Sequence, residues 1–272
     1  MSPPPIHLHQ IAYSPATLAA IEPGYLVLDN LANPRPDWFE YGPIRRFLLN
    51  EALDDAAFYG FFSPKFGAKT GLTHADVVRA VQSAAPVADV VLFSPQPDMG
   101  AFFLNVFEQA ETFDAGFIAA FEEFLRHIGQ PAELRGMVMD VRQTVFSNYF
   151  VARPAFWRAW LAINEKLFAL CEGPPSDIQH MLTLGTSYPG AAQRKVFMQE
   201  RTASYLLCAQ ASWRSVACNP FVFAWSATRF RDHPVEAVIS DALKTAYRDR
   251  PYPEYLQAYG RVREIFTGKP LL

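Results

Sequence analysis

The stretch FYGFFSPKFGAKTGLTHADVVRAVQSAAPVADVVLFSP, residues 58–95, decides the fold class. It begins and ends with apolar runs, residues 58–62 and 88–93, whose length suits strands buried on both faces. Between them, Thr73 and Asp76 form a capping-box-like pattern that predicts the start of a helix. The connection is long enough for a parallel crossover, so the stretch predicts an α/β sheet in the first half of the chain.

Other segments extend this pattern on both sides. Residues 6–13 and 146–151 alternate apolar and polar side chains like half-buried strands, and residues 25–28 form a second short apolar run. Helical spacing of apolar residues marks the segments 117–128, 156–170, 192–211, 234–249 and 255–266. Residues 173–190 are rich in Gly, Pro, Ser and Thr and predict a mobile loop. The second half of the chain is therefore expected to be mostly helical.

Composition excludes several classes of protein. Half of the 272 residues are hydrophobic and 19% are charged, which excludes a disordered chain. The net charge of −3 argues against nucleic acid as the main partner, because phosphate binding needs a positive field. Three cysteines without a Cys-x-x-Cys pair predict reduced thiols rather than disulfides or a zinc ribbon. No signal peptide and no long apolar window are present, so we expect a cytoplasmic protein.

Charge is distributed unevenly along the chain. Residues 1–193 carry 12 basic and 20 acidic side chains, whereas residues 194–272 carry 12 basic and 7 acidic ones. The basic C-terminal third predicts a peripheral contact with anionic lipid or with phosphate. The alternative is a set of solvated helix faces.

Several common catalytic signatures are absent. Neither Gly-x-Gly-x-x-Gly after the first strand nor Gly-x-x-x-x-Gly-Lys-Ser/Thr occurs, which disfavours a nucleotide held by a glycine-rich loop. Gly-x-Ser-x-Gly is missing, which weakens an α/β-hydrolase interpretation. The six histidines are scattered with no His-x-x-x-His pair, so a zinc hydrolase is disfavoured.

Polar side chains form four clusters after the predicted strands, at residues 29–41, 63–71, 105–111 and 140–150. Open α/β sheets bind ligands beyond the carboxyl ends of their strands. The candidate substrate-binding residues are Asp29, Asn30, Glu40, Tyr41, Ser63, Lys65, Lys69, Thr70, Asn105, Gln109, Arg142 and Asn148. Each cluster also has a structural interpretation, such as turn caps, solvated lysines, or an ion pair between Asp140 and Arg142. Four such clusters together favour a ligand site.

Three runs of sequence carry a resemblance to a known family. They are Asn33-Pro-Arg-Pro-Asp-Trp with Glu40-Tyr-Gly-Pro-Ile-Arg-Arg-Phe-Leu, Tyr59-Gly-Phe-Phe-Ser-Pro-Lys-Phe with Lys69-Thr-Gly-Leu, and Ser147-Asn-Tyr-Phe-Val-Ala-Arg-Pro-Ala-Phe-Trp. Over residues 25–170 the chain resembles glycosyltransferases encoded in bacterial capsule and O-antigen polysaccharide clusters. The order of its parts also resembles that of GT-A nucleotide-sugar transferases, in which a Ser-Asn-aromatic-aromatic strand leads into a helix near the acceptor.

The resemblance implies one GT-A-like catalytic domain over residues 1–272, with a Rossmann-like mixed sheet in the N-terminal half. Residues 1–152 would bind the nucleotide-sugar, and residues 153–272 would form a helical acceptor-side part. The implied reaction transfers a sugar from a nucleoside-diphosphate sugar to a hydroxyl of a growing surface polysaccharide or lipid-linked oligosaccharide. It implies a cytoplasmic enzyme with a possible peripheral contact with the inner membrane.

The implied chemistry needs particular side chains. An inverting transferase needs a carboxylate as general base, and Glu108 and Asp140 are the candidates. The leaving diphosphate needs positive charge, which many GT-A enzymes supply with Mn²⁺ or Mg²⁺ bound by Asp-x-Asp. This chain has no Asp-x-Asp. Two alternatives for the positive charge stay open: a metal held by Asp29-Asn30 or Asp98, or the side chains of Lys65, Lys69 and Arg142.

Two other functions also stay open from the sequence. A non-catalytic carbohydrate-binding or scaffold protein of a polysaccharide pathway would stack exposed aromatics, such as Trp38 and Trp157, on sugars. A glycoside hydrolase would use two carboxylates and no nucleotide. Binding of a nucleotide separates the transferase from both alternatives.

Overall fold

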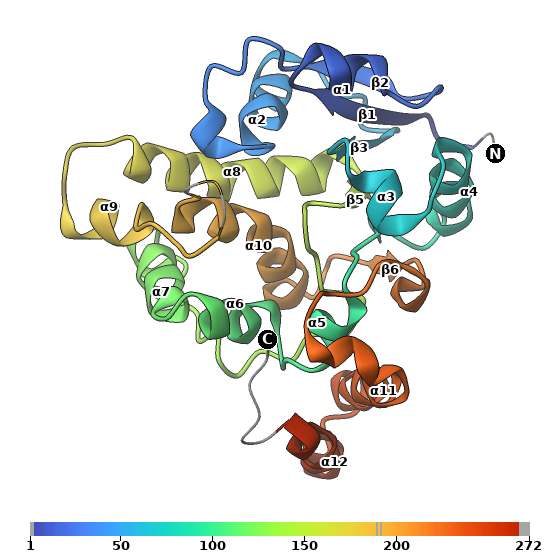
Figure 1. The fold of residues 1–272 in the computed structure, drawn as a ribbon, viewed down its shortest axis with the longest axis vertical. Coiled ribbons are helices and arrows are strands. Elements are labelled where there is room, and N and C mark those ends of the chain that lie inside the picture. Colours follow the sequence, from blue (N-terminus) through green and yellow to red (C-terminus); the bar gives the residue numbers. More distant parts are fainter. Residues whose placement is uncertain (1–2, 189, 191, 267–272) are drawn as a thin grey trace.

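The computed structural model describes residues 3–188, 190 and 192–266 as an α/β fold around a six-stranded mixed sheet (Figure 1). The strands are β1 Ile6–Ala12, β2 Leu26–Asp29, β3 Phe58–Phe62, β4 Val90–Leu92, β5 Phe150–Ala152 and β6 Ser215–Ala217. They lie in the order β2-β1-β3-β5-β4-β6. Only β5 among them runs antiparallel to its neighbours, β3 and β4. The α/β class expected from the sequence is confirmed.

Two details of the sheet differ from the sequence prediction. The strand expected over residues 146–151 begins only at Phe150, because Ser147 and Asn148 have φ angles of 59° and 52° and form a turn. The short strand β6 was not predicted, and it places part of the C-terminal half in the sheet. Three residues carry too little pattern to reveal a strand, and β6 exists through its parallel pairing with β4.

The described part of the chain contains twelve α-helices. They are α1 Pro15–Ala19, α2 Tyr41–Asn50, α3 Phe66–Thr70, α4 His74–Ala84, α5 Pro97–Ala101, α6 Val106–Phe113, α7 Phe117–His127, α8 Pro154–Cys171, α9 Asp177–Leu182, α10 Arg194–Ala209, α11 Pro234–Asp249 and α12 Pro253–Arg263. Short 3-10 helices are Pro36–Trp38, Pro220–Val222, Arg229–Asp232 and Glu264–Phe266.

Local signals explain where several helices begin. The predicted capping box of α4 is present, since Thr73 and Asp76 each accept a hydrogen bond from the backbone N–H of the other. The prediction of a mobile loop over residues 173–190 is wrong for Asp177–Leu182, because these residues form α9. Ser176 starts α9 by accepting a hydrogen bond from the backbone N–H of Gln179.

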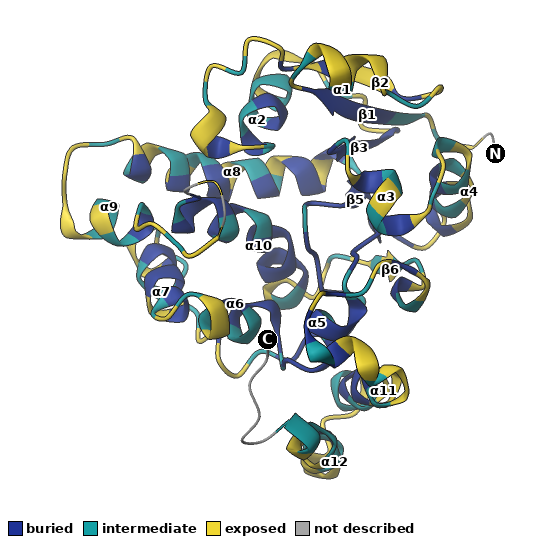
Figure 2. Cartoon of the chain, in the orientation of Figure 1, coloured by how far each residue is buried: buried dark blue, intermediate teal, exposed yellow. Residues whose placement is uncertain are grey.

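The two faces of the sheet bury separate apolar clusters. On one face, Phe61 and Leu92 pack in the same cluster as Trp157 and Trp160 of α8. On the other face, the side chains of β3 and β4 that point the opposite way pack in a cluster with Val77 of α4. Figure 2 shows β1, β3 and much of α8 and α10 as buried, whereas the edge strand β2 is largely exposed. The sheet is therefore covered on both faces, which explains why its strands are apolar runs.

The charge imbalance along the sequence is largely neutralised in space. Basic side chains of the C-terminal third pair with acidic side chains of the first 193 residues, as in Arg194–Asp114, Lys195–Asp37, Arg214–Asp89, Arg248–Asp140 and Arg263–Glu108. These pairs reduce the free positive charge on which the predicted contact with anionic lipid depends. Within the described ranges, no helix combines the length and the apolar character needed to cross a membrane.

Replacement of Gly60 by Ala tests the packing around the central strand β3. A Cβ atom there would lie 2.8 Å from Cγ2 of Val151 and 3.2 Å from Cδ2 of Leu8. We expect Gly60→Ala to lower the free energy of unfolding by about 1–3 kcal/mol, measured by urea denaturation. The matched control is Gly260→Ala in α12, where no atom lies within 4 Å of the new Cβ and helix propensity predicts a gain of about 0.5–1 kcal/mol. Equal effects at both sites would contradict the packing described.

Candidate functional site

A cavity of about 850 Å³ lies at the edge of the sheet where the parallel strands end. Residues that directly follow β1, β2 and β3, namely Tyr13, Asn30 and Ser63, line it. Because β5 is antiparallel, its amino end lies at this same edge, and the preceding residues Phe146 and Ser147 also line the cavity. Helices α6, α7 and α10 supply the remaining side (Figure 1). This is the position expected for a ligand of an open α/β sheet.

The backbone around the cavity is strained. In the described part of the chain, five residues other than glycine have positive φ angles: Asn33 (35°), Phe39 (46°), Gln96 (60°), Ser147 (59°) and Asn148 (52°). All but Asn148 line the cavity. Each such conformation costs roughly 1–3 kcal/mol, and such residues concentrate at active sites and ligand clamps. Their grouping here supports the cavity as the functional site.

The structure brings six of the sequence-predicted residues together in this cavity. They are Asn30, Glu40, Ser63, Lys65, Lys69 and Gln109. The ammonium group of Lys69 donates to Oγ of Ser147 at 3.0 Å, and burial lowers the pKa of this lysine. Lys65 is exposed at the other end of the same short segment. Two cations thus lie on one side of the cavity, with the carboxylate of Glu40 also in its wall.

Four predicted binding residues have structural roles outside the cavity. Asp29 accepts a hydrogen bond from the backbone N–H of Leu31 at 2.9 Å in an exposed turn. The buried Tyr41 donates to Glu165, and the buried Thr70 donates to the carbonyl of Phe66. Asn105 caps α6 by accepting from the backbone N–H groups of Phe107 and Glu108. Their side chains are thus engaged in turns, packing and capping.

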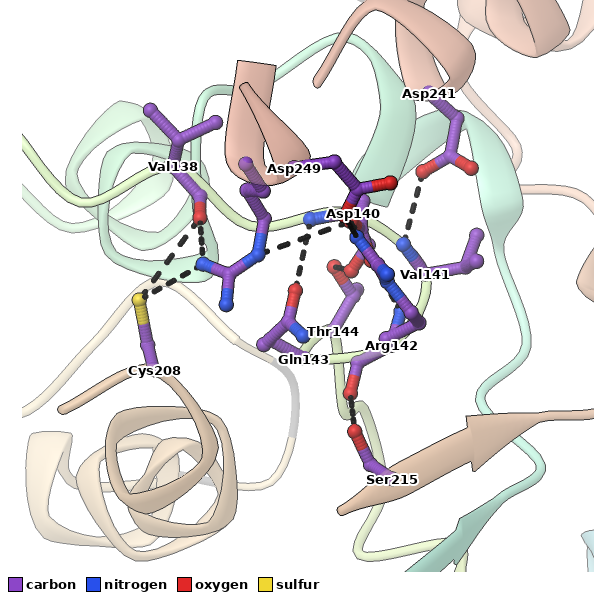
Figure 3. A network of polar contacts seen from close by, with 11 residues as sticks. Val138, Asp140, Val141, Arg142, Gln143, Thr144, Cys208, Ser215, Asp241 and Asp249 are labelled. Atoms are coloured by element: carbon purple, nitrogen blue, oxygen red, sulfur yellow. Dashed lines mark hydrogen bonds and ion pairs between the residues drawn. The ribbon is translucent and has the colours of Figure 1, made fainter. Parts of the chain in front are cut away.

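Both proposed general bases are also held in ion pairs away from the cavity lining. Glu108 pairs with Arg263 at 2.7 Å. Asp140 is fully buried and pairs with Arg142 at 2.6 Å (Figure 3). It also lies 3.7 Å from Arg248. Carboxylates committed to arginines do not readily accept a substrate proton. The predicted catalytic roles of Glu108 and Asp140 therefore do not fit this geometry.

Arg142 and Asn148 likewise contact protein groups. Arg142 bridges Asp140 and Asp249, which fixes the segment shown in Figure 3. The amide of the buried Asn148 donates to Oε1 of Gln199 at 3.2 Å. Asn148 thus acts on the cavity indirectly, by holding the turn that carries Ser147.

The candidate metal ligands do not form a metal site. Asp98 is fully buried and accepts hydrogen bonds from both the backbone and the hydroxyl of Ser226. Asp29 is occupied in its turn. In the part of the chain that the structure describes, no three His, Cys, Asp or Glu side chains are grouped to hold a metal ion. Asp29 and Asp98 are therefore engaged with protein groups and do not fit the role of metal ligands, and Lys65 and Lys69 are cations that an anionic ligand in the cavity can meet.

Glu200 of α10 lines the cavity and was missed by the sequence analysis. Its side chain is 23% exposed, and its nearest cation, Arg201, lies 3.9 Å away. Burial raises the pKa of Glu200 to about 7, with a further increase from Glu40 and opposing effects of Arg201 and Lys69. A carboxyl group with this pKa in a cleft is suited to proton transfer near neutral pH.

No local sequence signal identified Glu200, and the structure shows why. This helix buries Arg194, Lys195, Gln199 and Arg201, although charged residues are rarely buried without a partner or a function. In the sequence the segment has helical spacing only, and nothing shows that its polar residues point inward. Their inward direction depends on packing against α6 and α8, which is a tertiary property.

The aromatic residues of the carbohydrate-binding alternative are wrongly placed for that role. Trp38 is 1% exposed, and Trp157 is fully buried and donates its indole N–H to the carbonyl of Tyr59. Other aromatics reach the cavity instead, and of these Tyr13, Phe39, Phe113 and Tyr188 are exposed.

Comparison of the chain with protein-family models, with curated proteins and with solved structures found no match. The functional argument therefore rests on the cavity and its side chains. The resemblance to surface-polysaccharide glycosyltransferases stays a hypothesis.

Replacement of Glu200 by Gln tests whether the carboxyl group is desolvated. A folded-state pKa raised to about 7 from the ordinary value of 4.5 means that wild-type stability falls as pH rises through this range. Glu200→Gln removes this loss, so its stability relative to wild type should rise between pH 5 and pH 8, by on the order of 2 kcal/mol. Urea denaturation at both pH values measures it. If the difference in the free energy of unfolding between Glu200→Gln and wild type does not change with pH, the carboxyl group is solvated rather than buried.

Proposed function

We propose that this protein is a glycosyltransferase that binds a nucleoside-diphosphate sugar in the cavity and transfers its sugar to an acceptor hydroxyl. The observation that carries the proposal is the meeting of Lys65, Lys69 and the partly buried Glu200 in one cavity at the strand ends. Glycosyl transfer needs positive charge at the leaving diphosphate and a base at the acceptor. The cavity contains both kinds of group.

The donor is assigned to the side of the cavity formed by the sheet. Tyr13 is 44% exposed after β1 and offers a ring on which a nucleobase can stack. The neighbouring Asn33 offers a side-chain amide for hydrogen bonds to the base or ribose. Lys65 and Lys69 follow β3, so the diphosphate is assigned to them, as point charges that stabilise the leaving group.

Glu200 takes the role of general base in this proposal. With a pKa of about 7 it is partly ionised at neutral pH, and it can accept the proton of the attacking hydroxyl. The cation of Arg201 is held by hydrogen bonds to Gln109 and to the carbonyl of Val106, so it does not neutralise Glu200 closely. Glu40 also lines the cavity, and repulsion between the two carboxylates keeps the proton affinity of Glu200 high.

The finer assignment to the GT-A type depends on the order of the structural elements along the chain. The turn at Ser147 and Asn148 leads through β5 directly into α8, with Pro154 in its first turn. This is the order that the resemblance implies near the acceptor. The mixed sheet supports the assignment.

A glycoside hydrolase is the second candidate, because Glu40 and Glu200 place two carboxyl groups in one cavity. Such an enzyme has no use for the two lysines. Nucleotide binding therefore distinguishes the two functions.

A thermal-shift screen with UDP, GDP, CDP and CMP, with and without Mn²⁺, tests the transferase. A nucleotide at 100 times its Kd stabilises the folded protein by about 2.7 kcal/mol, so the melting temperature should rise. Lys69→Ala should weaken binding roughly tenfold, or about 1.4 kcal/mol, whereas Lys166→Ala, on the exposed side of α8, should change nothing. The absence of a shift with every nucleotide would contradict the proposal.

Glu200→Gln separates chemistry from donor binding. We expect transfer to fall by about 10²-fold or more while the nucleotide-induced thermal shift remains, because only proton transfer is lost. Glu108→Gln is the matched control, since Glu108 lies outside the cavity and should retain activity. Radiolabelled sugar transfer to a mixed acceptor extract measures both variants. Full activity of Glu200→Gln would remove this residue from the mechanism.

A further inference from the structure

The two sides of the cavity differ in chemistry. The sheet side carries Lys65, Lys69, Ser63 and Glu40. The opposite side, which we call the helical wall, consists of the lining residues of α6, α7 and α10 and of the loop before α10. Its apolar members are Ala110, Phe113, Phe117, Tyr188, Ala192, Val196 and Phe197. One side is therefore suited to a charged ligand and the other to an apolar group.

Apart from Glu200, the charged side chains of the helical wall are held by protein partners, as is the amide oxygen of Gln109. Oε1 of Gln109 accepts a hydrogen bond from Arg201 at 2.6 Å, and Arg201 also donates to the carbonyl groups of Val106 and Phe197. Asp114 accepts two hydrogen bonds of 2.7 Å from Arg194. The guanidinium groups of Arg194 and Arg201 are therefore engaged with protein acceptors, which reduces the capacity of this wall to bind the hydroxyls of a sugar.

Two aromatic side chains of this wall remain accessible. Phe113 is 39% exposed and Tyr188 is 56% exposed, although both line the cavity. The ring of Tyr188 packs edge-on against Phe197 at 5.4 Å between centroids. Covering such surface with an apolar ligand group is favourable, because it removes apolar area from water.

Glu200 lies next to this apolar surface on α10. Val196 and Phe197 precede it by four and three residues, so the three side chains share one face of the helix, with Cβ atoms about 5–6 Å apart. A hydroxyl that donates to Glu200 therefore has the apolar wall one helical turn away.

We propose that the helical wall binds an apolar group carried by the acceptor, close to the hydroxyl that is glycosylated. This inference rests on the proposed transferase function and narrows it, since the acceptor is then an aryl or alkyl glycoside rather than a free saccharide. The apolar group lies on Phe113 and Tyr188, and the accepting hydroxyl faces Glu200. The donor occupies the opposite, cationic side of the same cavity.

Binding of three simple glycosides to the full chain tests this inference without any donor. Phenyl, octyl and methyl β-D-glucopyranoside share one sugar and differ only in the apolar group, and saturation-transfer NMR titration below the micelle concentration of the octyl compound measures each Kd. We expect phenyl or octyl glucoside to bind at least tenfold more tightly than methyl glucoside. The stronger of the two identifies an aryl or an alkyl group.

Two substitutions locate the effect. Phe113→Ser and Tyr188→Ser should each reduce the preference for the apolar glucosides at least threefold. Leu49→Ser is the control, because Leu49 is 50% exposed on α2 outside this cavity and should leave the preference unchanged. All three residues are exposed, so circular dichroism melting curves should stay close to wild type.

The outcomes also separate this inference from the proposed function. Equal affinity for all three glucosides, no detectable binding of any, or a preference that survives both substitutions overturns the inference, even if nucleotides bind. A preference lost in Phe113→Ser together with no nucleotide binding upholds the apolar subsite and overturns the transferase.

Discussion

The candidate site depends on the reversed direction of β5 between β3 and β4. A parallel strand at this position would send residues 146–149 to the opposite edge of the sheet. Because β5 is antiparallel, this turn meets the segments that follow β3 and β4. Oγ of Ser63 and Oη of Tyr149 then lie 2.6 Å apart, and Lys69 reaches Ser147. The strained turn at Ser147 and Asn148 and the segment that carries Lys65 and Lys69 therefore hold one another in place.

Helix α10 supplies the other half of the site, at the cost of burying charge. Unpaired charges are expensive in a protein interior, so the buried cations of α10 need partners. Arg194 forms an ion pair with Asp114 at the end of α6, and Lys195 forms one with Asp37 in the segment before α2. These pairs join the C-terminal third to distant parts of the chain and fix the direction of α10. Glu200 differs from them, because its environment raises its pKa.

Part of the site could be predicted from the sequence for a clear physical reason. Asn30, Ser63, Lys65 and Lys69 follow parallel strands, and strand ends can be recognised from apolar runs that stop at polar residues. The same reasoning failed for Asp140, which lies in an irregular segment where polar residues serve as turn caps and ion-pair partners. Sequence alone does not distinguish a carboxylate that faces an arginine from one that faces a cavity.

The sequence by itself determined the α/β class, the strands β1 to β4, the last part of the strand predicted for residues 146–151, the cap of α4, and the lysine-containing segment that follows β3. These features depend on apolar periodicity and on hydrogen bonds between residues close in the chain. Tertiary structure alone decided the antiparallel insertion of β5, the strand β6 and the inward direction of the polar residues of α10. Each of these depends on partners far away in the sequence, such as β4 for β6 and Asp114 for Arg194, and local patterns carry no information about such partners.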